Sequence, residues 1–189
     1  MLTHASKQRW WRRLVPGSHR VPEILQYETT ECGASCVAMV LAYFGRWEPI
    51  DRLRQICGTT RDGISAGALV RAARLLQLHA KGFGVRAAEL NTLPMPQILF
   101  WNFNHFVVLE RIKGDAVDIV DPAVGRRRIR MADLESGYSG VTLCMEPGPD
   151  FTFSGRAPSV FREVVKASNG SGFAIAITAL VGLGIAILT

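Results

Sequence analysis

The sequence predicts an α+β domain in which an N-terminal helical half packs on a C-terminal antiparallel sheet. Apolar residues recur with a helical period in the first half of the chain, whereas β-branched and aromatic residues dominate the second half. A turn signal, Lys113-Gly114-Asp115, separates two of the strand-like runs. Helices followed by antiparallel strands form two layers around one core. With 48% hydrophobic residues in 189, the chain has ample material for such a core.

Three helices are expected in the first half. The range Cys32–Phe44 carries its apolar residues on one helical stripe, the pattern of a helix packed against a core. A short second helix, Ile50–Ile56, follows Pro49, whose missing N–H costs little in a first turn. The third spans Ser65–Leu78, with its first residue as a candidate N-cap.

The second half is expected to form antiparallel strands. Their residues are rich in Val, Ile and aromatic side chains, which suit a pleated sheet. The predicted strands are 97–101, 105–112, 116–120 and 141–145. The basic run Arg126–Arg130 alternates like an exposed edge strand, where charge discourages pairing with other chains.

The two ends of the chain differ from its middle. Residues 1–20 are basic and lack the apolar stretch of a signal peptide, so we expect the domain to stay in the cytoplasm. This arm either lies on an anionic membrane or acidic partner, or is a solvated tail. Residues 173–189 are apolar and uncharged. They predict the start of a first transmembrane helix that is cut off, since a full span needs about 20 such residues; the alternative is a buried C-terminal helix.

These observations predict a division of the chain into an N-terminal arm, a globular domain, a linker and a truncated membrane segment. The corresponding ranges are 1–20, 21–151, 152–172 and 173–189.

Cys32 is the candidate nucleophile. It lies where an extended segment gives way to a predicted helix, and the positive end of a helix dipole favours a thiolate. Gly33 beside it is expected to leave room for a peptide backbone. The side-chain amide of Gln26, together with the Cys32 backbone N–H, is the candidate oxyanion hole.

His105 and Asp121 are the candidate base and orienting group. His105 begins one predicted strand and Asp121 ends the next, so the hairpin between them brings these two ends together. Asp121 then holds the imidazole in the tautomer that accepts the thiol proton. Asp118 is the alternative carboxylate, but it lies inside its strand.

Three strings carry a family resemblance. They are Gln26-x5-Cys32-Gly33-Ala34-Ser35-Cys36, Asn104-His105-Phe106-Val107-Val108 and Asp121-Pro122. They closely resemble the peptidase domain of bacteriocin-processing ABC transporters, and the match covers about Val21 to Phe151. The phrases at 99–105 and 146–151 look most like the branch that serves peptides with nitrile-hydratase-like leaders.

The resemblance implies a papain-like cysteine endopeptidase that removes the leader of a precursor peptide after a double-glycine-type motif. Its catalytic triad matches Cys32, His105 and Asp121, and its oxyanion-hole glutamine matches Gln26. Glu31 departs from the family, in which many members carry Asp before the nucleophile.

The resemblance also implies a larger transporter around this domain. A membrane domain and an ATP-binding domain follow in the family, the full-length protein is a homodimer, and the peptidase domain lies on the cytoplasmic side of the bacterial membrane. Neither Walker motif is present in this sequence, so ATP and Mg²⁺ are expected only in the ATP-binding domain and this segment needs no cofactor.

Rival interpretations use the same residues. The domain is alternatively a non-catalytic module that binds the leader and recruits cargo. A metal held by Cys32 and Cys36 lacks two further ligands, so no metal is expected. The net charge of +6 suggests an anionic or nucleic-acid partner only weakly, and no nucleic acid is expected. Trp101 and Phe103 either pack the core or wall a substrate groove.

Overall fold

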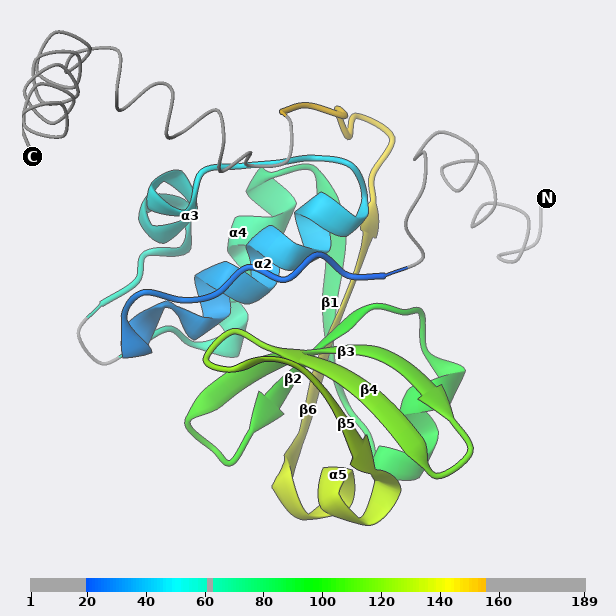
Figure 1. Ribbon diagram of the computed structural model, residues 1–189. Helices are drawn as coiled ribbons and strands as arrows, with labels where there is room; N and C mark the ends of the chain where they lie inside the picture. The colour runs from blue at the N-terminus through cyan, green and yellow to red at the C-terminus, as the bar shows by residue number, and fades with distance from the viewer. Residues whose placement is uncertain (1–19, 61–62, 156–189) are drawn as a thin grey trace, which may run out of the picture. The chain divides into compact units, whose positions relative to one another are not determined.

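A computed structural model of the chain describes residues 20–60 and 63–155, which belong to one compact unit. Three helices form one layer of this unit and a six-stranded sheet forms the other (Figure 1). The helices are α2 (Cys32–Tyr43), α3 (Ile50–Cys57) and α4 (Ala66–Leu75), and a 3-10 turn, η2 (Thr29–Glu31), leads into the first. The two-layer α+β fold expected from the sequence is confirmed.

The sheet is antiparallel throughout, in the order β1-β6-β2-β3-β4-β5. Its strands are β1 (Leu78–Gly84), β2 (Gln97–Trp101), β3 (His105–Lys113), β4 (Ala116–Asp121), β5 (Gly125–Arg130) and β6 (Tyr138–Pro147). Two short helices, η3 (Ala87–Thr92) and α5 (Met131–Gly137), lie in its connections. The basic strand β5 is an edge strand, as predicted.

The sheet buries apolar side chains on both faces. Phe106 and Val108 of β3 pack into the cluster that contains the α2 side chains. Val107 and Leu109 alternate with them and pack with residues of η3 and α5. All of α2 from Cys32 to Ala42 is buried, so the helix that begins at Cys32 is the rigid centre of the domain.

The third helix is shorter than predicted. It begins after Ser65, whose hydroxyl accepts the N–H of Ala68 at 3.2 Å and confirms the expected cap. The helix ends at Leu75, and Gln77 has a φ of +67°, which turns the chain into β1. The prediction that the helix continues to Leu78 was therefore wrong, and β1 was absent from the predicted strands.

Three predicted segments lie wholly or mostly outside the described residues. These are the basic arm up to residue 19 and everything from residue 156, which includes most of the linker and the expected membrane segment 173–189. No helix within 20–60 and 63–155 is long and apolar enough to cross a membrane. The division of the chain into arm, domain, linker and membrane segment stays a prediction.

Gly33 is required by packing between helices. A Cβ at this position would lie 2.5 Å from Ile64 Cγ2 and 3.0 Å from Leu69 Cδ2. The missing side chain therefore lets the first turn of α2 approach α4 and the residues before it. This packing role accounts for the glycine within the domain, and the expected room for a substrate backbone stays a prediction.

We predict that Gly33→Ala destabilises the domain by about 1–3 kcal/mol, because the added methyl group overpacks the contact with Ile64 and Leu69. Gly67→Ala is the matched control. Gly67 is exposed within α4, and its new Cβ would meet only Arg71 Nη1 at 3.5 Å. Because alanine favours a helix over glycine by about 0.5–1 kcal/mol, the control should be stabilised. Urea unfolding measures both, and equal stability of the two variants would contradict the packing role.

Candidate active site

Cys32 is the first residue of α2, and the turn before it is fixed by Glu31. The buried Glu31 carboxylate accepts the backbone N–H groups of Tyr27 at 2.8 Å and Glu28 at 3.1 Å. Its second oxygen lies 3.0 Å from Arg54 Nε on α3. The acidic residue that departs from the family pattern thus ties the segment before Cys32 to the helical layer.

His105 and Asp121 are in direct contact, as the hairpin geometry predicted. His105 Nε2 lies 2.8 Å from Asp121 Oδ1, between the start of β3 and the end of β4. The same carboxylate oxygen accepts the backbone N–H of Ala123 at 2.9 Å, which fixes its orientation. Asp118 is instead bound by Arg128, 2.7 Å from its Nε, so it is not the partner of His105.

The His105 ring is linked to both Cys32 and Asp121. Burial favours the neutral ring, but hydrogen bonds to Asp121 and Cys32 and the charges of both outweigh this effect and raise the pKa of His105 to about 9. Burial opposes the charged form of Asp121 as well, yet the hydrogen bonds from His105 and Ala123 hold its pKa below the usual value. A charged imidazolium is therefore the favoured state of His105 at neutral pH.

Gln26 lies in the extended segment that precedes η2. Its backbone N–H donates to the carbonyl of Pro122 at 2.9 Å, next to Asp121. Its side-chain oxygen Oε1 is buried and accepts no hydrogen bond from the residues that the structure describes. The structure therefore brings Cys32, His105 and Asp121 together and attaches the Gln26 segment to the turn after Asp121.

The remaining cysteines are buried and free. Cys36, Cys57 and Cys144 form no disulfide. Within residues 20–60 and 63–155 there is also no group of three or more Cys, His, Asp or Glu side chains placed to hold a metal ion. Cys36 lies in the main apolar cluster, where a small hydrophobic residue fits.

Trp101 and Phe103, two aromatic residues near His105, have different environments. A Cβ on Gly137 would lie 2.3 Å from Trp101 Cζ2, so the Trp101 ring packs against the backbone of α5. Phe103 is 78% exposed with a φ of +59°, and its N–H donates to Ser139 Oγ at 2.9 Å. Trp101 therefore supports the fold, and only Phe103 offers its ring to the surface beside His105.

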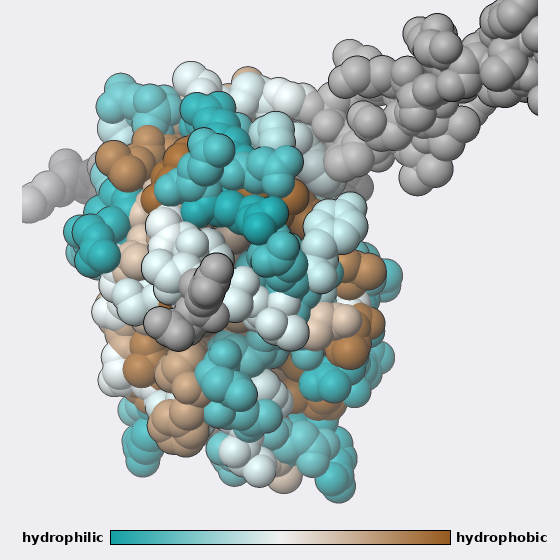
Figure 2. Space-filling model, turned by 90° about the vertical axis from the view of Figure 1, so that its left-hand side faces the viewer, coloured by the Kyte–Doolittle hydropathy of each residue, from teal (hydrophilic) through white to brown (hydrophobic). Residues whose placement is uncertain are grey.

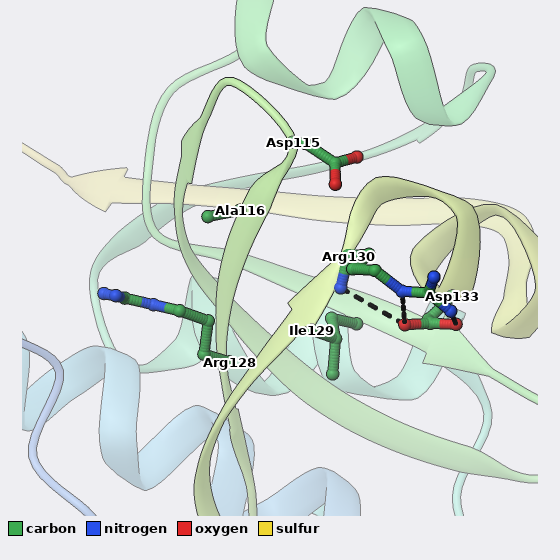
Figure 3. Close-up of a pocket in the computed structure, with 6 residues that line it drawn as sticks. All are labelled: Asp115, Ala116, Arg128, Ile129, Arg130 and Asp133. Carbon is green, nitrogen blue, oxygen red and sulfur yellow. Dashed lines mark hydrogen bonds and ion pairs between the residues drawn. The ribbon is translucent and has the colours of Figure 1, made fainter.

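The arginines of β5 are all paired with carboxylates, which reduces the positive field of this strand. Arg126 pairs with Glu23 and Glu110, Arg127 with Asp121, Arg128 with Asp118 and Arg130 with Asp133. Figure 3 shows the last pair beside a pocket at the end of the β4–β5 ladder where Ala116 pairs with Arg130. The candidate site lies at the opposite end of this ladder, where Asp121 pairs with Gly125.

Comparison with known proteins identifies the family of this chain. Residues 20–150 match the family described as the peptidase C39 family. The chain belongs to this family. It is 35% identical over 141 residues, 75% of its length, to the probable microcin-H47 secretion/processing ATP-binding protein of Escherichia coli. The match covers 19% of that relative, so the chain spans about a fifth of its length.

Two solved structures resemble the domain. A double glycine motif protease from an AMS/PCAT transporter, in complex with its leader peptide, is 42% identical, with a TM-score of 0.67 over 70% of this chain and 96% of its own. The peptidase domain of Streptococcus ComA is 23% identical, with a TM-score of 0.64 over 68% of this chain and 99% of its own, and shows the shared fold. Together they confirm that the C39 domain is papain-like, with helices packed on an antiparallel sheet.

We predict that His105 titrates near pH 9 and that Asp121→Asn lowers this value, because the variant removes an anionic hydrogen-bond partner of the imidazolium. Folding raises the pKa from the ordinary 6.5, so the stabilisation from the charged ring is complete below about pH 6.5 and is lost as pH rises through 9. NMR of the labelled imidazole measures the titration, with His105→Gln to assign the signal. An unchanged midpoint in Asp121→Asn would contradict this account.

We also predict that iodoacetamide labels Cys32 before the other three cysteines at neutral pH. Burial raises the pKa of Cys36 well above its ordinary value, that of Cys57 to about 11 and that of Cys144 to about 12, so these thiols stay protonated. Mass spectrometry of tryptic peptides gives the order of labelling. Equal rates at all four sites would show that the position at the start of α2 confers no special reactivity.

Proposed function

We propose that the chain is a cysteine endopeptidase that removes the leader of a ribosomally made precursor peptide after a double-glycine-type motif. The observation that carries this proposal is a thiol at the start of a buried helix, in contact with a histidine that a carboxylate holds at 2.8 Å. A thiolate next to an imidazolium is the arrangement that nucleophilic catalysis by cysteine requires. Family membership and the 42% identity to a double glycine motif protease support the substrate class.

Catalysis begins with attack of the Cys32 thiolate on the carbonyl carbon of the second small residue of the motif. The negative charge that develops on the carbonyl oxygen is stabilised by the Cys32 backbone N–H and the Gln26 side-chain amide. His105, charged at neutral pH, gives its proton to the leaving amine. Asp121 keeps the ring oriented for both steps.

A second step releases the leader. The neutral His105 formed by acylation takes a proton from water, which attacks the thioester and regenerates the thiolate. Two adjacent small residues suit a narrow approach to the thiol, so bulky side chains at either position are rejected sterically.

The surface around the site is suited to an apolar peptide. Six large apolar side chains are exposed in the described part of the chain, and four of them are within three residues of Gln26, His105 or Asp121. These four are Leu25, Tyr27, Phe103 and Val124. Figure 2 shows one face of the molecule, on which apolar residues lie among hydrophilic ones. An amphipathic leader helix is the ligand that such side chains fit.

The proposal extends to the larger protein. Relatives named as secretion/processing ATP-binding proteins support an N-terminal peptidase domain of a peptide-exporting ABC transporter. In this proposal the transporter is a homodimer in the bacterial cytoplasmic membrane, the domain faces the cytoplasm, and ATP with Mg²⁺ binds to a separate domain. Specialisation for nitrile-hydratase-like leaders stays a prediction that rests on the phrases around residues 99–105 and 146–151.

The rival function is leader binding without cleavage. Such a module needs no nucleophile, no base and no orienting carboxylate. This chain retains Cys32 in contact with the His105–Asp121 pair, which favours the enzyme.

We predict that the chain cuts a peptide with a double-glycine leader at that motif and that Cys32→Ala abolishes cleavage. Because the variant removes the nucleophile and not the binding surface, leader affinity should stay within about twofold. Mass spectrometry locates the cut and fluorescence anisotropy measures affinity, with Cys36→Ala as the matched thiol control. If wild type and Cys32→Ala bind equally and neither cuts, the binding module is correct.

A further inference from the structure

The segment from Val21 to Gln26, which we call the strap, joins the two layers of the domain. Its last residue donates its N–H to the carbonyl of Pro122, beside Asp121. Beyond Gln26, the chain is tied to the helical layer through Glu31 and Arg54. The position of the Gln26 amide therefore depends on how the strap is held against the sheet.

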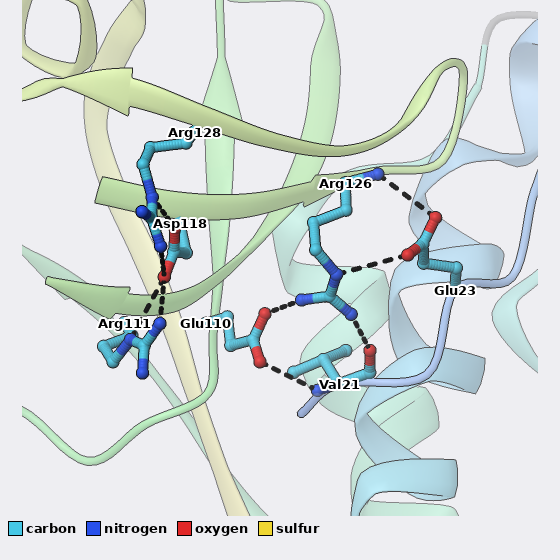
Figure 4. A network of polar contacts seen from close by, with 7 residues as sticks. All are labelled: Val21, Glu23, Glu110, Arg111, Asp118, Arg126 and Arg128. Carbon is cyan, nitrogen blue, oxygen red and sulfur yellow. Dashed lines mark hydrogen bonds and ion pairs between the residues drawn. The ribbon is translucent and has the colours of Figure 1, made fainter. Parts of the chain in front are cut away.

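Arg126 holds the other end of the strap. Its Nη2 donates to the Val21 carbonyl at 2.6 Å, and its Nε donates to Glu23 Oε1 at 3.2 Å. The backbone N–H of Arg126 reaches the second oxygen of Glu23 at 3.3 Å. Its Nη1 donates to Glu110, which also accepts the Val21 N–H at 3.3 Å. Figure 4 shows this guanidinium between two carboxylates and the strap backbone.

An irregularity in the pairing of β3 with β4 directs the Glu110 side chain toward Arg126. Leu109 pairs with Ile119 and Arg111 pairs with Asp118, so Glu110 is an extra residue in β3 and forms a β-bulge. Bulges re-aim side chains and are common next to active sites. The Glu110 side chain is only 8% exposed, and a buried carboxylate requires a cationic partner, which Arg126 provides.

From this geometry we infer that Arg126 is a positioning residue for peptide cleavage, acting through the strap on the Gln26 amide. The inference rests on the proposed function and on the oxyanion role of Gln26 within it. Arg126 follows directly after the turn that contains Asp121 and Gly125, and Asp121 pairs with Gly125 in the ladder. One short stretch of chain thus orients His105 through Asp121 and places Gln26 through Arg126.

The test is a double-mutant cycle on the full chain with the double-glycine leader peptide. A misplaced oxyanion donor costs catalysis and not binding, so Arg126→Met should lower kcat by about 10- to 100-fold with KM within about twofold. The same substitution in a Gln26→Ala background should change kcat by less than about twofold, because the donor that it positions is already absent. Alkylation of Cys32 by iodoacetamide forms no oxyanion, and its rate should stay within about twofold.

Two further variants keep the test decisive. Glu23→Ala removes one tie on a side chain that is 48% exposed, so it should fold normally and lower kcat in the same direction. Arg128→Met is the matched control, because Arg128 lies on the same strand and contacts Asp118 in a separate group (Figure 4). It should leave kcat unchanged.

Each outcome is informative. Absence of cleavage by the wild-type chain would overturn the proposed function itself. If the wild type cleaves but Gln26→Ala leaves kcat unchanged, or if Arg126→Met lowers kcat equally with and without Gln26, the positioning role is overturned while the proposed function stands. Thermal unfolding of Glu23→Ala and Arg126→Met separates loss of fold from loss of position, and a kcat of folded Glu23→Ala equal to wild type also overturns the role.

Discussion

The antiparallel pairing of β3 with β4 is the constraint on which the site depends. It places the first residue of one strand beside the last residue of the other, so that His105 and Asp121 meet at 2.8 Å without any special loop. The hairpin is buried on both faces, since alternate residues of β3 belong to two apolar clusters. Packing of the core therefore fixes the orientation of His105. No mobile loop has to be ordered to place the ring.

The second requirement is that the helical layer places Cys32 beside the His105–Asp121 pair of the sheet. Nearly every residue of α2 is buried, and Gly33 lets its first turn approach Ile64 and Leu69 closely. The nucleophile begins a buried helix, and the base begins a strand whose next four residues are buried. Their separation is therefore fixed by the packing of the two layers. The raised pKa of His105 is a consequence of this meeting, because interactions with Asp121 and Cys32 outweigh the effect of burial.

Much of this arrangement could be predicted from the sequence because it depends on local patterns. Helical periodicity located α2, and Pro49 marked the start of α3. A glycine turn between two apolar runs was sufficient to bring His105 to Asp121. Sequence reasoning missed β1, whose run Leu-His-Ala-Lys-Gly-Phe-Gly is short of β-branched residues and ends in glycine. The predicted third helix continued to Leu78 because no glycine or proline signals the end of α4. The chain turns instead at Gln77, whose backbone is in the left-handed region.

The polar contacts that support the site could not be predicted, and the reason is physical. Glu31 with Arg54 and Glu110 with Arg126 are pairs of ordinary charged residues whose partners are distant in sequence, and Arg126 meets Val21 across 105 positions. The sequence pattern does not reveal that a β-bulge turns the Glu110 carboxylate inward. A bulge exists only in the pairing of a strand with its partner, and this pairing is not visible in the sequence of one strand. Catalytic groups at strand and helix ends follow from local rules, whereas the groups that hold them follow from tertiary packing. Basic residues that sequence reasoning assigned to an exposed edge strand thus include Arg126, the one that ties the oxyanion segment to the sheet.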